Sequence, residues 1–462
     1  MPEFLLSQDR KYKRTWGGPT PRIGVMDGSI YSIVGEPQVR HILKDNFANY
    51  IKGSNFQDAL EEFLGSGIFS ADGATWKHHR KVASTMFTRN LMRHGAVTAN
   101  KHVNHVVTLL NRTASTNQTI DLQDVFFKMT IDVFSEIAFG VDLQSVLAEN
   151  PTPFAAAFDQ IQAGCHKRFS DPFWRLQRFL QSCERERMIT AKAKIINTLA
   201  ENVINSRRRD AELDNKLGPD LLSRFLDKSV KDGNGEMTSK QLRDIVMNFM
   251  IAGRDTTACA MSWSIYELTK NPECAERIIA EVESVMGDRL TKGGNGGANA
   301  DADADADAAD GIYEKIGELK YTHSVITEVL RLHPSVPTDL KYAVQDDTLP
   351  DGTKILAGAT VIYSPYAINR DKVSWGKDAD EFNPSRFFDK LEPSTFKYPT
   401  FNAGPRLCLG KNLAYLELKL ALAVLLTNFR FAFEEGNVHK GGYACTLVLP
   451  MKPALNMTVT RR

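Results

Sequence analysis

The sequence has no long apolar run. None of its stretches reaches the roughly 18 apolar residues that a membrane-spanning helix requires. The apolar patch Phe4-Leu5-Leu6 near the N-terminus is too short for the core of a signal peptide. We therefore expect neither a secretory leader nor an N-terminal membrane anchor in this chain.

A strong net charge and paired cysteines are missing too. The net charge of +1 gives no bulk attraction to nucleic acid. The six cysteines are spread along the chain without a Cys-x-x-Cys pair, which argues against zinc ribbons and thioredoxin-type redox motifs. Scattered cysteines of this kind fit a reducing compartment better than a disulfide scaffold.

The chain does contain enough apolar material for a large core, since 42% of its 462 residues are hydrophobic and 24% are charged. Length alone would suggest about three domains, but no linker divides the chain, so we predict one domain over residues 1–462. Residues 293–311 combine glycines with alternating aspartate and alanine. Such a stretch predicts a disordered insertion in a surface loop.

One cysteine stands in a distinctive loop that runs from Phe401 to Gly410. Cys408 follows Gly404 and lies directly before an amphipathic helical pattern. A helix N-terminus offers free backbone N–H groups and the positive end of a dipole, which stabilise a thiolate. A thiolate held by N–H donors is the kind of sulfur that ligates haem iron and favours O–O cleavage. The two glycines lack a Cβ, so they let backbone and a flat macrocycle approach closely.

Arg406 lies in the same loop. It has no obvious local carboxylate partner in the sequence, so a haem propionate is the expected partner. The alternative for Cys408 is a buried packing cysteine, the usual fate of a free thiol.

A second signal is a long, largely apolar helical pattern over residues 238–272. Thr238 or Ser239 can cap its start, and an Asn-Pro pair ends it. About 30 residues would span about 45 Å, the width of a domain, so we expect this helix to be buried. Gly253 in its interior costs about 1 kcal/mol relative to alanine, and close approach of a cofactor is expected to compensate.

Asp255 and Thr256 place an acid and an alcohol side by side in this helix. The alcohol can bond back to a preceding carbonyl and open the helix locally. By itself, the pair can be explained as a satisfied hydrogen bond of the core.

Two further pairs have helical spacing. Trp76 and Arg80 are four residues apart, so an indole N–H and a guanidinium share one face and can donate to carboxylates. Glu328 and Arg331 are three apart and can form an ion pair. Taken alone, the first pair is more often a surface stack, and the second is common in any helix.

Taken together, these segments resemble the cytochrome P450 family. Residues 401–410 match every fixed position of its haem-loop pattern F-x-x-G-x-R-x-C-x-G, and residues 252–257 match its oxygen-activating pattern (A/G)-G-x-(D/E)-T-(T/S). The W-x-x-x-R and E-x-x-R helices and the later P-x-R-(F/W) segment are present as well, in family order, with Ser385 where glutamate is common. The similarity runs from roughly residue 20 to residue 460.

The resemblance implies the cytochrome P450 fold, which is mainly α with a small β-rich region. It implies haem b (iron protoporphyrin IX) with Cys408 as the iron ligand, and proton delivery by Asp255 and Thr256. The other residues that the resemblance assigns to the cofactor are Trp76, Arg80, Gly253, Phe401, Gly404, Arg406 and Gly410. It also implies a buried structural triad beneath the haem, formed by Glu328, Arg331 and Arg386.

The implied reaction is monooxygenation of a long-chain apolar substrate. One atom of O2 enters the substrate, the other leaves as water, and two electrons come from NADPH through a cytochrome P450 reductase or a similar flavoprotein. Residues 67–73, 249–257, 335–339 and 349–352 look like the fatty-acid and alkane omega-hydroxylases of plants and fungi. We therefore expect hydroxylation of a fatty acid near its omega end.

The same resemblance implies the cytosolic face of the endoplasmic reticulum, with peripheral membrane contact, and a cytoplasmic location is the alternative. The residues leave open whether the family's N-terminal anchor is missing or the sequence is incomplete. A basic face for an acidic reductase is expected, although a solvated surface of mixed charge is equally compatible; its residues are Lys77, His78, Lys81, Arg89, Arg93 and Lys411. The rival functions are a haem enzyme that isomerises or dehydrates hydroperoxides and a non-catalytic haem-binding protein.

Overall fold

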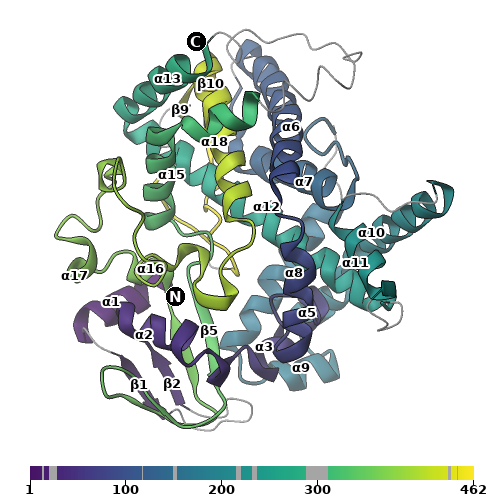
Figure 1. Ribbon diagram of the computed structural model, residues 1–462, viewed down its shortest axis with the longest axis vertical. Helices are drawn as coiled ribbons and strands as arrows, with labels where there is room; N and C mark the ends of the chain where they lie inside the picture. The colour runs from purple at the N-terminus through teal and green to yellow at the C-terminus, as the bar shows by residue number, and fades with distance from the viewer. Residues whose placement is uncertain are drawn as a thin grey trace.

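The computed structural model describes residues 1–12, 15–19, 29–116, 118–148, 153–214, 220–231, 237–287, 311–434, 439–444 and 446–462. The predicted insertion at residues 293–311 lies outside these ranges except for Gly311. Helices make up most of the molecule, and a small sheet occupies one side of it (Figure 1). The predicted fold class, mainly α with a small β-rich region, is confirmed.

The helices of the first part of the chain are α1 (Pro2–Tyr12), α2 (Glu36–Arg40), α3 (Gly53–Ala59), α4 (Glu61–Leu64), α5 (Gly73–Ser84), α6 (Arg89–Thr116), α7 (Leu122–Phe139), α8 (Pro153–Lys167) and α9 (Trp174–Leu180). Those of the second part are α10 (Glu184–Asp214), α11 (Leu221–Lys231), α12 (Ser239–Lys270), α13 (Pro272–Met286), α15 (Lys320–Leu332), α16 (Pro365–Ile368), α17 (Lys372–Trp375) and α18 (Lys411–Asn428). The strands are β1 (Trp16–Pro19), β2 (Ser29–Ser32), β3 (Tyr50–Ile51), β4 (Ile120–Asp121), β5 (Asp339–Ala343), β6 (Asp347–Thr348), β7 (Lys354–Ile355), β8 (Thr360–Tyr363), β9 (Phe429–Phe433) and β10 (Asn456–Arg461).

Helix α12 crosses the middle of the molecule (Figure 1). Thr238 is its cap: the Thr238 hydroxyl accepts from the Gln241 N–H at 3.2 Å, and the Thr238 N–H donates to Gln241 Oε1 at 2.9 Å. Nearly every side chain from Leu242 to Leu268 is buried, because α7, α10, α15 and α18 pack around the helix. The predicted buried helix is therefore confirmed along its length.

The largest sheet joins both parts of the chain. Its strand order is β1-β2-β8-β5-β3, with β2 and β8 parallel and the other neighbours antiparallel. Figure 1 shows this sheet at the lower left beside α1 and α2. Strand β5 follows α15 and a short loop, and it pairs with β8 and β3 in this sheet. Side chains of β5 take part in the functional site described below.

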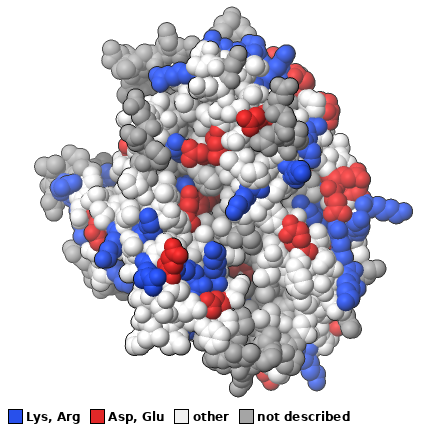
Figure 2. Space-filling view, turned by 180° about the vertical axis from the view of Figure 1, so that it is seen from behind, with Lys and Arg blue, Asp and Glu red and all other residues white. Residues whose placement is uncertain are grey.

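Charges of both signs are interspersed on the described residues of the face seen in Figure 2, without a broad field of one sign there. This pattern agrees with 57 basic and 56 acidic residues in the whole chain. No helix among the described residues is long and apolar enough to cross a membrane.

Candidate functional site

The cysteine loop, residues 401–410, directly precedes α18. Two 3-10 turns, Pro399–Phe401 and Gly404–Arg406, precede Cys408, whose N–H donates to the Phe401 carbonyl at 2.9 Å. The Cys408 sulfur in turn accepts from the backbone N–H groups of Gly410 and Lys411 at the start of α18. Desolvation raises the pKa of the Cys408 thiol, and these two donors oppose that shift. Many atoms surround this thiol, which accounts for its desolvation, but they do not cover the surface of the residue, so Cys408 is not a packed core cysteine.

The two glycines of this loop, Gly404 and Gly410, have different surroundings. Gly404 has φ +61°, and a Cβ on it would lie 1.9 Å from the Leu43 carbonyl oxygen. Close backbone packing therefore requires this glycine, and its assignment to the cofactor stays a prediction. At Gly410 a Cβ would lie 3.8 Å from the Phe87 ring and 4.0 Å from the Cys408 sulfur; these are ordinary contacts, so the assignment of this glycine to the cofactor stays a prediction.

Helix α5 holds the loop from the other side. Arg80 donates to the carbonyl of Leu407, the residue before the cysteine, at 2.6 Å. The buried Trp76 ring lies 6.0 Å from the Arg80 guanidinium and 4.7 Å from that of Arg406. The predicted shared face of Trp76 and Arg80 is therefore confirmed, and it faces the cysteine loop.

Arg406 has no local carboxylate partner, as expected, but it pairs with a carboxylate from a distant part of the chain. Its Nη2 donates to Asp72 Oδ1 at 2.8 Å and to the Ala71 carbonyl at 2.7 Å. Asp72 precedes α5 and lies more than 300 positions away in the chain, so only the fold brings the pair together. The Nε of Arg406 is buried and has no hydrogen-bond partner among the described residues.

The middle of α12 presents a small accessible face. Ala252, Gly253 and Thr256 are partly accessible within an otherwise buried stretch, and their spacing places them on one side of the helix. Thr256 Oγ1 donates to the Ala252 carbonyl at 2.7 Å, as predicted. A Cβ on Gly253 would lie 2.1 Å from the Phe134 ring of α7. Helix packing therefore gives a sufficient reason for this glycine, and its assignment to the cofactor stays a prediction.

Asp255 turns to the other side of α12 and is 1% exposed. Its carboxylate accepts from Gln162 Nε2 at 2.6 Å and from Arg254 Nη1 at 2.7 Å. Burial raises the pKa of Asp255 to about 6, although Arg254 opposes the shift. The described contacts of this carboxylate are those of a satisfied core group rather than a bond to Thr256.

The predicted triad is formed and is deeply buried. Arg331 donates to Glu328 through Nε at 2.6 Å and through Nη2 at 2.8 Å, and both residues are 0% exposed. Arg386 Nε lies 3.5 Å from Glu328 Oε1, and its Nη2 pairs with Asp378 at 2.6 Å. Ser385, where glutamate is common, leaves this arrangement intact.

Comparisons with known proteins agree with these motifs. A family model described as cytochrome P450 matches residues 3–455. Cytochrome P450 704B1 of Arabidopsis thaliana is 36% identical, over 95% of this chain and 88% of the relative. Cytochrome P450 704C1 of Pinus taeda is 37% identical over 92% and 83%, and cytochrome P450 94A1 of Vicia sativa is 32% identical over 93% and 81%. The chain belongs to the cytochrome P450 family.

This P450 is therefore a haem-dependent monooxygenase, and its residues fit the cofactor. Beside the cysteine loop lies a cluster of buried and half-buried charged groups: Lys52, Asp72, Arg80, Asp339, Lys341 and Arg406. The four cations exceed the two carboxylates by two charges, which equals the charge of the two propionates of haem b. We call this set the basic cluster.

Within the basic cluster, Lys341 is the group with the least compensation. It is 0% exposed, its Nζ makes no hydrogen bond with a described residue, and its nearest carboxylate, Asp339, lies 3.7 Å away. Burial lowers the pKa of Lys341 to about 7, and the neighbouring charge of Lys52 acts in the same direction. Burial alone would raise the pKa of Asp339, yet Lys52 and Lys341 hold it below its ordinary value. A haem propionate would supply the hydrogen-bond acceptor that Lys341 Nζ and Arg406 Nε lack among the described residues.

Sequence reasoning missed Lys52, Asp339 and Lys341. A lysine in a short strand is usually exposed, and no local pattern indicates that β5 turns Lys341 inward. The one available signal was the polar pair Asp339 and Lys341 at a spacing of two, which places both on the same side of a strand.

One other group of side chains in the described part of the chain has metal-ligand spacing, namely His102, Glu136 and Asp142. The Lys101 ammonium lies between the two carboxylates, 2.8 Å from Glu136 and 2.7 Å from Asp142. The Lys101 ammonium thus occupies the position between the two carboxylates that a metal ion would need, so we do not assign a metal to this group.

Proposed function

We propose that this P450 hydroxylates a long-chain fatty acid near its omega end. The observation that carries the proposal is a cavity of about 400 Å³ between the sheet, α3 and α9, a size within the usual range for ligand pockets. Apolar side chains dominate its wall: Leu5, Ile30, Phe56, Ala59, Phe169, Trp174, Leu340, Ile362 and Leu447.

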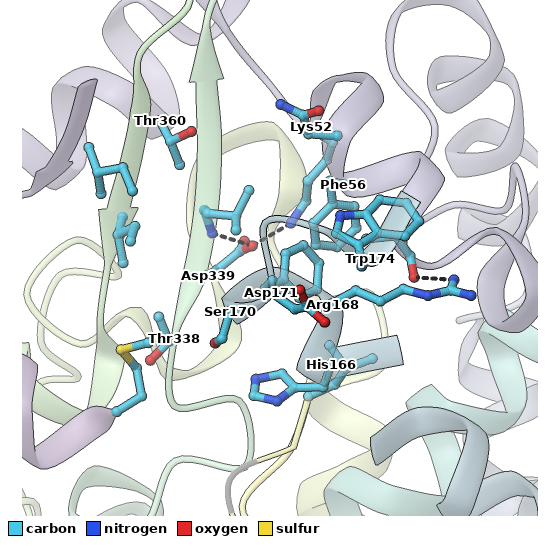
Figure 3. Close-up of a pocket in the computed structure, with 18 of the residues that line it drawn as sticks. Lys52, Phe56, His166, Arg168, Ser170, Asp171, Trp174, Thr338, Asp339 and Thr360 are labelled. Atoms are coloured by element: carbon cyan, nitrogen blue, oxygen red, sulfur yellow. Dashed lines mark hydrogen bonds and ion pairs between the residues drawn. The ribbon is translucent and has the colours of Figure 1, made fainter. Parts of the chain in front are cut away.

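The polar groups of this cavity lie at two separate places, an arrangement that suits a fatty acid with one polar end. Lys52 and Asp339, two members of the basic cluster, line it and pair with each other. His166, Ser170 and Arg175 line it near α9, and Figure 3 shows His166 and Ser170 apart from Lys52. A carboxylate held near α9 would leave the apolar chain to extend toward the basic cluster, so the far end of the chain would reach the haem first.

When bound, the haem supplies the activation of O2. This chain's residues then have distinct tasks in the proposal. The apolar cavity wall excludes water and orients the chain end, and Asp255 and Thr256 hold and pass the protons that reduction of O2 consumes. The Cys408 loop keeps its N–H donors directed at the sulfur.

The substrate class is tested by titrating the holoenzyme with fatty acids and measuring binding through the change in haem spin state. Arg175→Met should weaken fatty-acid binding about fivefold, or about 1 kcal/mol, because Arg175 is one-third exposed and already pairs with Asp58 at 2.8 Å. Arg178→Met is the matched control, since Arg178 lies on the same helix with 33% exposure but does not line the cavity. An alkane of equal length should bind both variants alike. Equal weakening of alkane and fatty acid would contradict a carboxylate site, and failure of every fatty acid to bind would refute the substrate class.

Membrane contact around this cavity is the second part of the proposal. Large apolar side chains are exposed at the cavity lining or near it in the chain: Met1, which lines the cavity, and Phe4, Phe173, Leu176, Phe179 and Leu180. Such a group near a cavity mouth suits contact with lipid. Phe179→Ser with Leu180→Ser should reduce binding to lipid vesicles, while Val373→Ser with Leu391→Ser, at residues 85% and 97% exposed elsewhere, should not.

The family's redox partner is a reductase, and we place it on the exposed side of α5. Lys77 and Lys81 are exposed there, one turn apart. Others of the predicted basic face are already paired, as Arg89 is with Glu314 and Lys411 with Glu392. Lys77→Glu with Lys81→Glu should slow reduction by the reductase at low ionic strength. Reduction that is insensitive to both the variant and salt would contradict this placement.

A further inference from the structure

A second ionic network lies between α8 and α12, outside the cavity. Arg254 is 3% exposed, and its Nη1 donates both to Asp159 Oδ1 and to Asp255 Oδ1, each at 2.7 Å. The Asp159 side chain is 55% exposed, whereas that of Asp255 is 1% exposed. One nitrogen atom thus joins a carboxylate in solvent to a carboxylate in the core.

The geometry permits a proton to pass between the two carboxylates. Because both bonded oxygens lie 2.7 Å from the same nitrogen, they are at most about 5.4 Å apart. One water molecule, with hydrogen bonds of about 2.7–2.8 Å to each oxygen, bridges such a distance. Slight side-chain movement would also bring them into direct contact.

The surroundings keep this junction in place. The Arg254 guanidinium lies 4.5 Å from the Phe127 ring of α7 and 5.2 Å from the Phe158 ring of α8. Gln162, one turn beyond Asp159 on α8, holds the second oxygen of Asp255 at 2.6 Å. A guanidinium does not give up its proton in proteins, so Arg254 positions the two carboxylates and does not itself carry the proton.

We propose that protons for the monooxygenase reaction enter through Asp159 on α8, and that Arg254 and Gln162 position Asp255 to receive them. The proposal rests on the proposed role of Asp255 and Thr256 in proton delivery, and it adds the residue at which solvent protons enter. Asp159 is the entry group, and Arg254 and Gln162 are positioning residues. In this proposal the protons do not pass through the substrate cavity.

The step balances as a simple transfer. Asp159 takes a proton from solvent and passes it, through one water, to the Asp255 carboxylate. Asp255 then turns or passes the proton toward Thr256, and Asp159 is protonated again. Each turnover consumes two protons and the two electrons from NADPH, with one O2 and one substrate giving one hydroxylated product and one water.

The electrostatics make Asp255 a suitable acceptor. Its pKa of about 6 results from burial, which raises it, from Arg254, which lowers it, and from Asp159, which raises it again. Gln162 on α8 also lowers it, and the Cys259 thiol lies one turn on along α12. Asp255 therefore gains and loses its proton near neutral pH. Removal of the negative charge at Asp159 should therefore move the titration of Asp255 to lower pH.

The test compares Asp159→Asn with Asp124→Asn in the holoenzyme with its reductase. Asp124 is the matched control: its side chain is 56% exposed and pairs with Lys128 at 2.7 Å. Asp159→Asn should slow product formation by about 10- to 100-fold, at or below the lower end of what a positioned proton donor contributes, and should raise the solvent isotope effect. Asp159→Glu should restore most of the rate, and Asp124→Asn should behave as the unchanged protein.

An infrared titration of the Asp255 carboxyl adds a readout independent of turnover. Asp159→Asn should shift that titration to lower pH, and Asp255→Asn should abolish its signal. If Asp255→Asn keeps full coupled turnover, the proposed role of Asp255 itself fails. If Asp255→Asn is impaired while Asp159→Asn matches Asp124→Asn in rate, isotope effect and titration, the entry site proposed here is overturned and the role of Asp255 stands.

Discussion

Replacement of Lys341 by methionine should make the P450 release its haem faster. Lys341 is fully buried and has no hydrogen-bond partner among the described residues, so the propionates are its natural counter-charges. A charge-assisted hydrogen bond contributes about 2 kcal/mol, which corresponds to about 30-fold at 1.36 kcal/mol per decade. Methionine keeps the length and most of the volume of the side chain, so the loss should come from the charge.

The same residue should make haem retention depend on pH. With the protein's own groups alone, the pKa of Lys341 is about 7 because burial and Lys52 disfavour its charge. Propionates favour that charge, so haem binding raises this pKa and takes up a proton above about pH 7. Affinity for haem should therefore fall as pH rises through this window, and Lys341→Met should remove this dependence.

The assay is transfer of haem to an excess of a haem-scavenging protein, followed by absorbance from pH 6 to pH 9. Lys419→Met is the control, because Lys419 is also a buried lysine of lowered pKa, but it bonds the Ile316 carbonyl at 3.1 Å away from the basic cluster. Equal release rates for Lys341→Met and the unchanged protein at pH 7 would refute the assignment of Lys341 to a propionate.

Three shorter predictions address the rest of the site. Glu328→Gln should prevent haem incorporation, since it leaves the buried Arg331 charge without its carboxylate at a cost of about 3–5 kcal/mol; the yield of protein with a thiolate-type reduced carbon-monoxide spectrum measures this, and a normal yield would contradict it. Gly253→Ala should lower the thermal midpoint through its clash with the Phe134 ring, and Phe134→Ala in the same chain should relieve the clash; equal destabilisation in both backgrounds would count against packing as the cause. Thr256→Ala should leave NADPH consumption in place but release peroxide instead of product, and unchanged coupling would remove this hydroxyl from the mechanism.

The sequence was sufficient for features that depend on local pattern. The cap at Thr238 and the end of α12 at Asn271 follow from the residue types at these positions. The burial of α12 follows from its apolar helical pattern, in which Gly253 is the main unfavourable residue. The triad pair at Glu328 and the shared face of Trp76 and Arg80 follow from helical spacing alone. These predictions needed no knowledge of what lies across the molecule.

Contacts between distant segments were not predictable in this way. Arg406 pairs with Asp72, and Gly404 packs on Leu43, because the fold brings segments more than 300 residues apart into contact. Gly253 illustrates the same limit: a missing Cβ indicates close approach, but periodicity does not tell whether a cofactor or the Phe134 ring approaches. The burial of Lys341 likewise depends on how the sheet packs, which the local pattern of β5 does not specify.

The mixed sheet has a consequence for how the chain is made. Strands β2 and β3 leave the ribosome early, but their partners β8 and β5 follow about 300 residues later. At about 5–20 residues per second, these early strands have unpaired edges for roughly 15–60 s of synthesis. Nascent chains of this protein should therefore depend on chaperones that cover β-edges until translation passes β8.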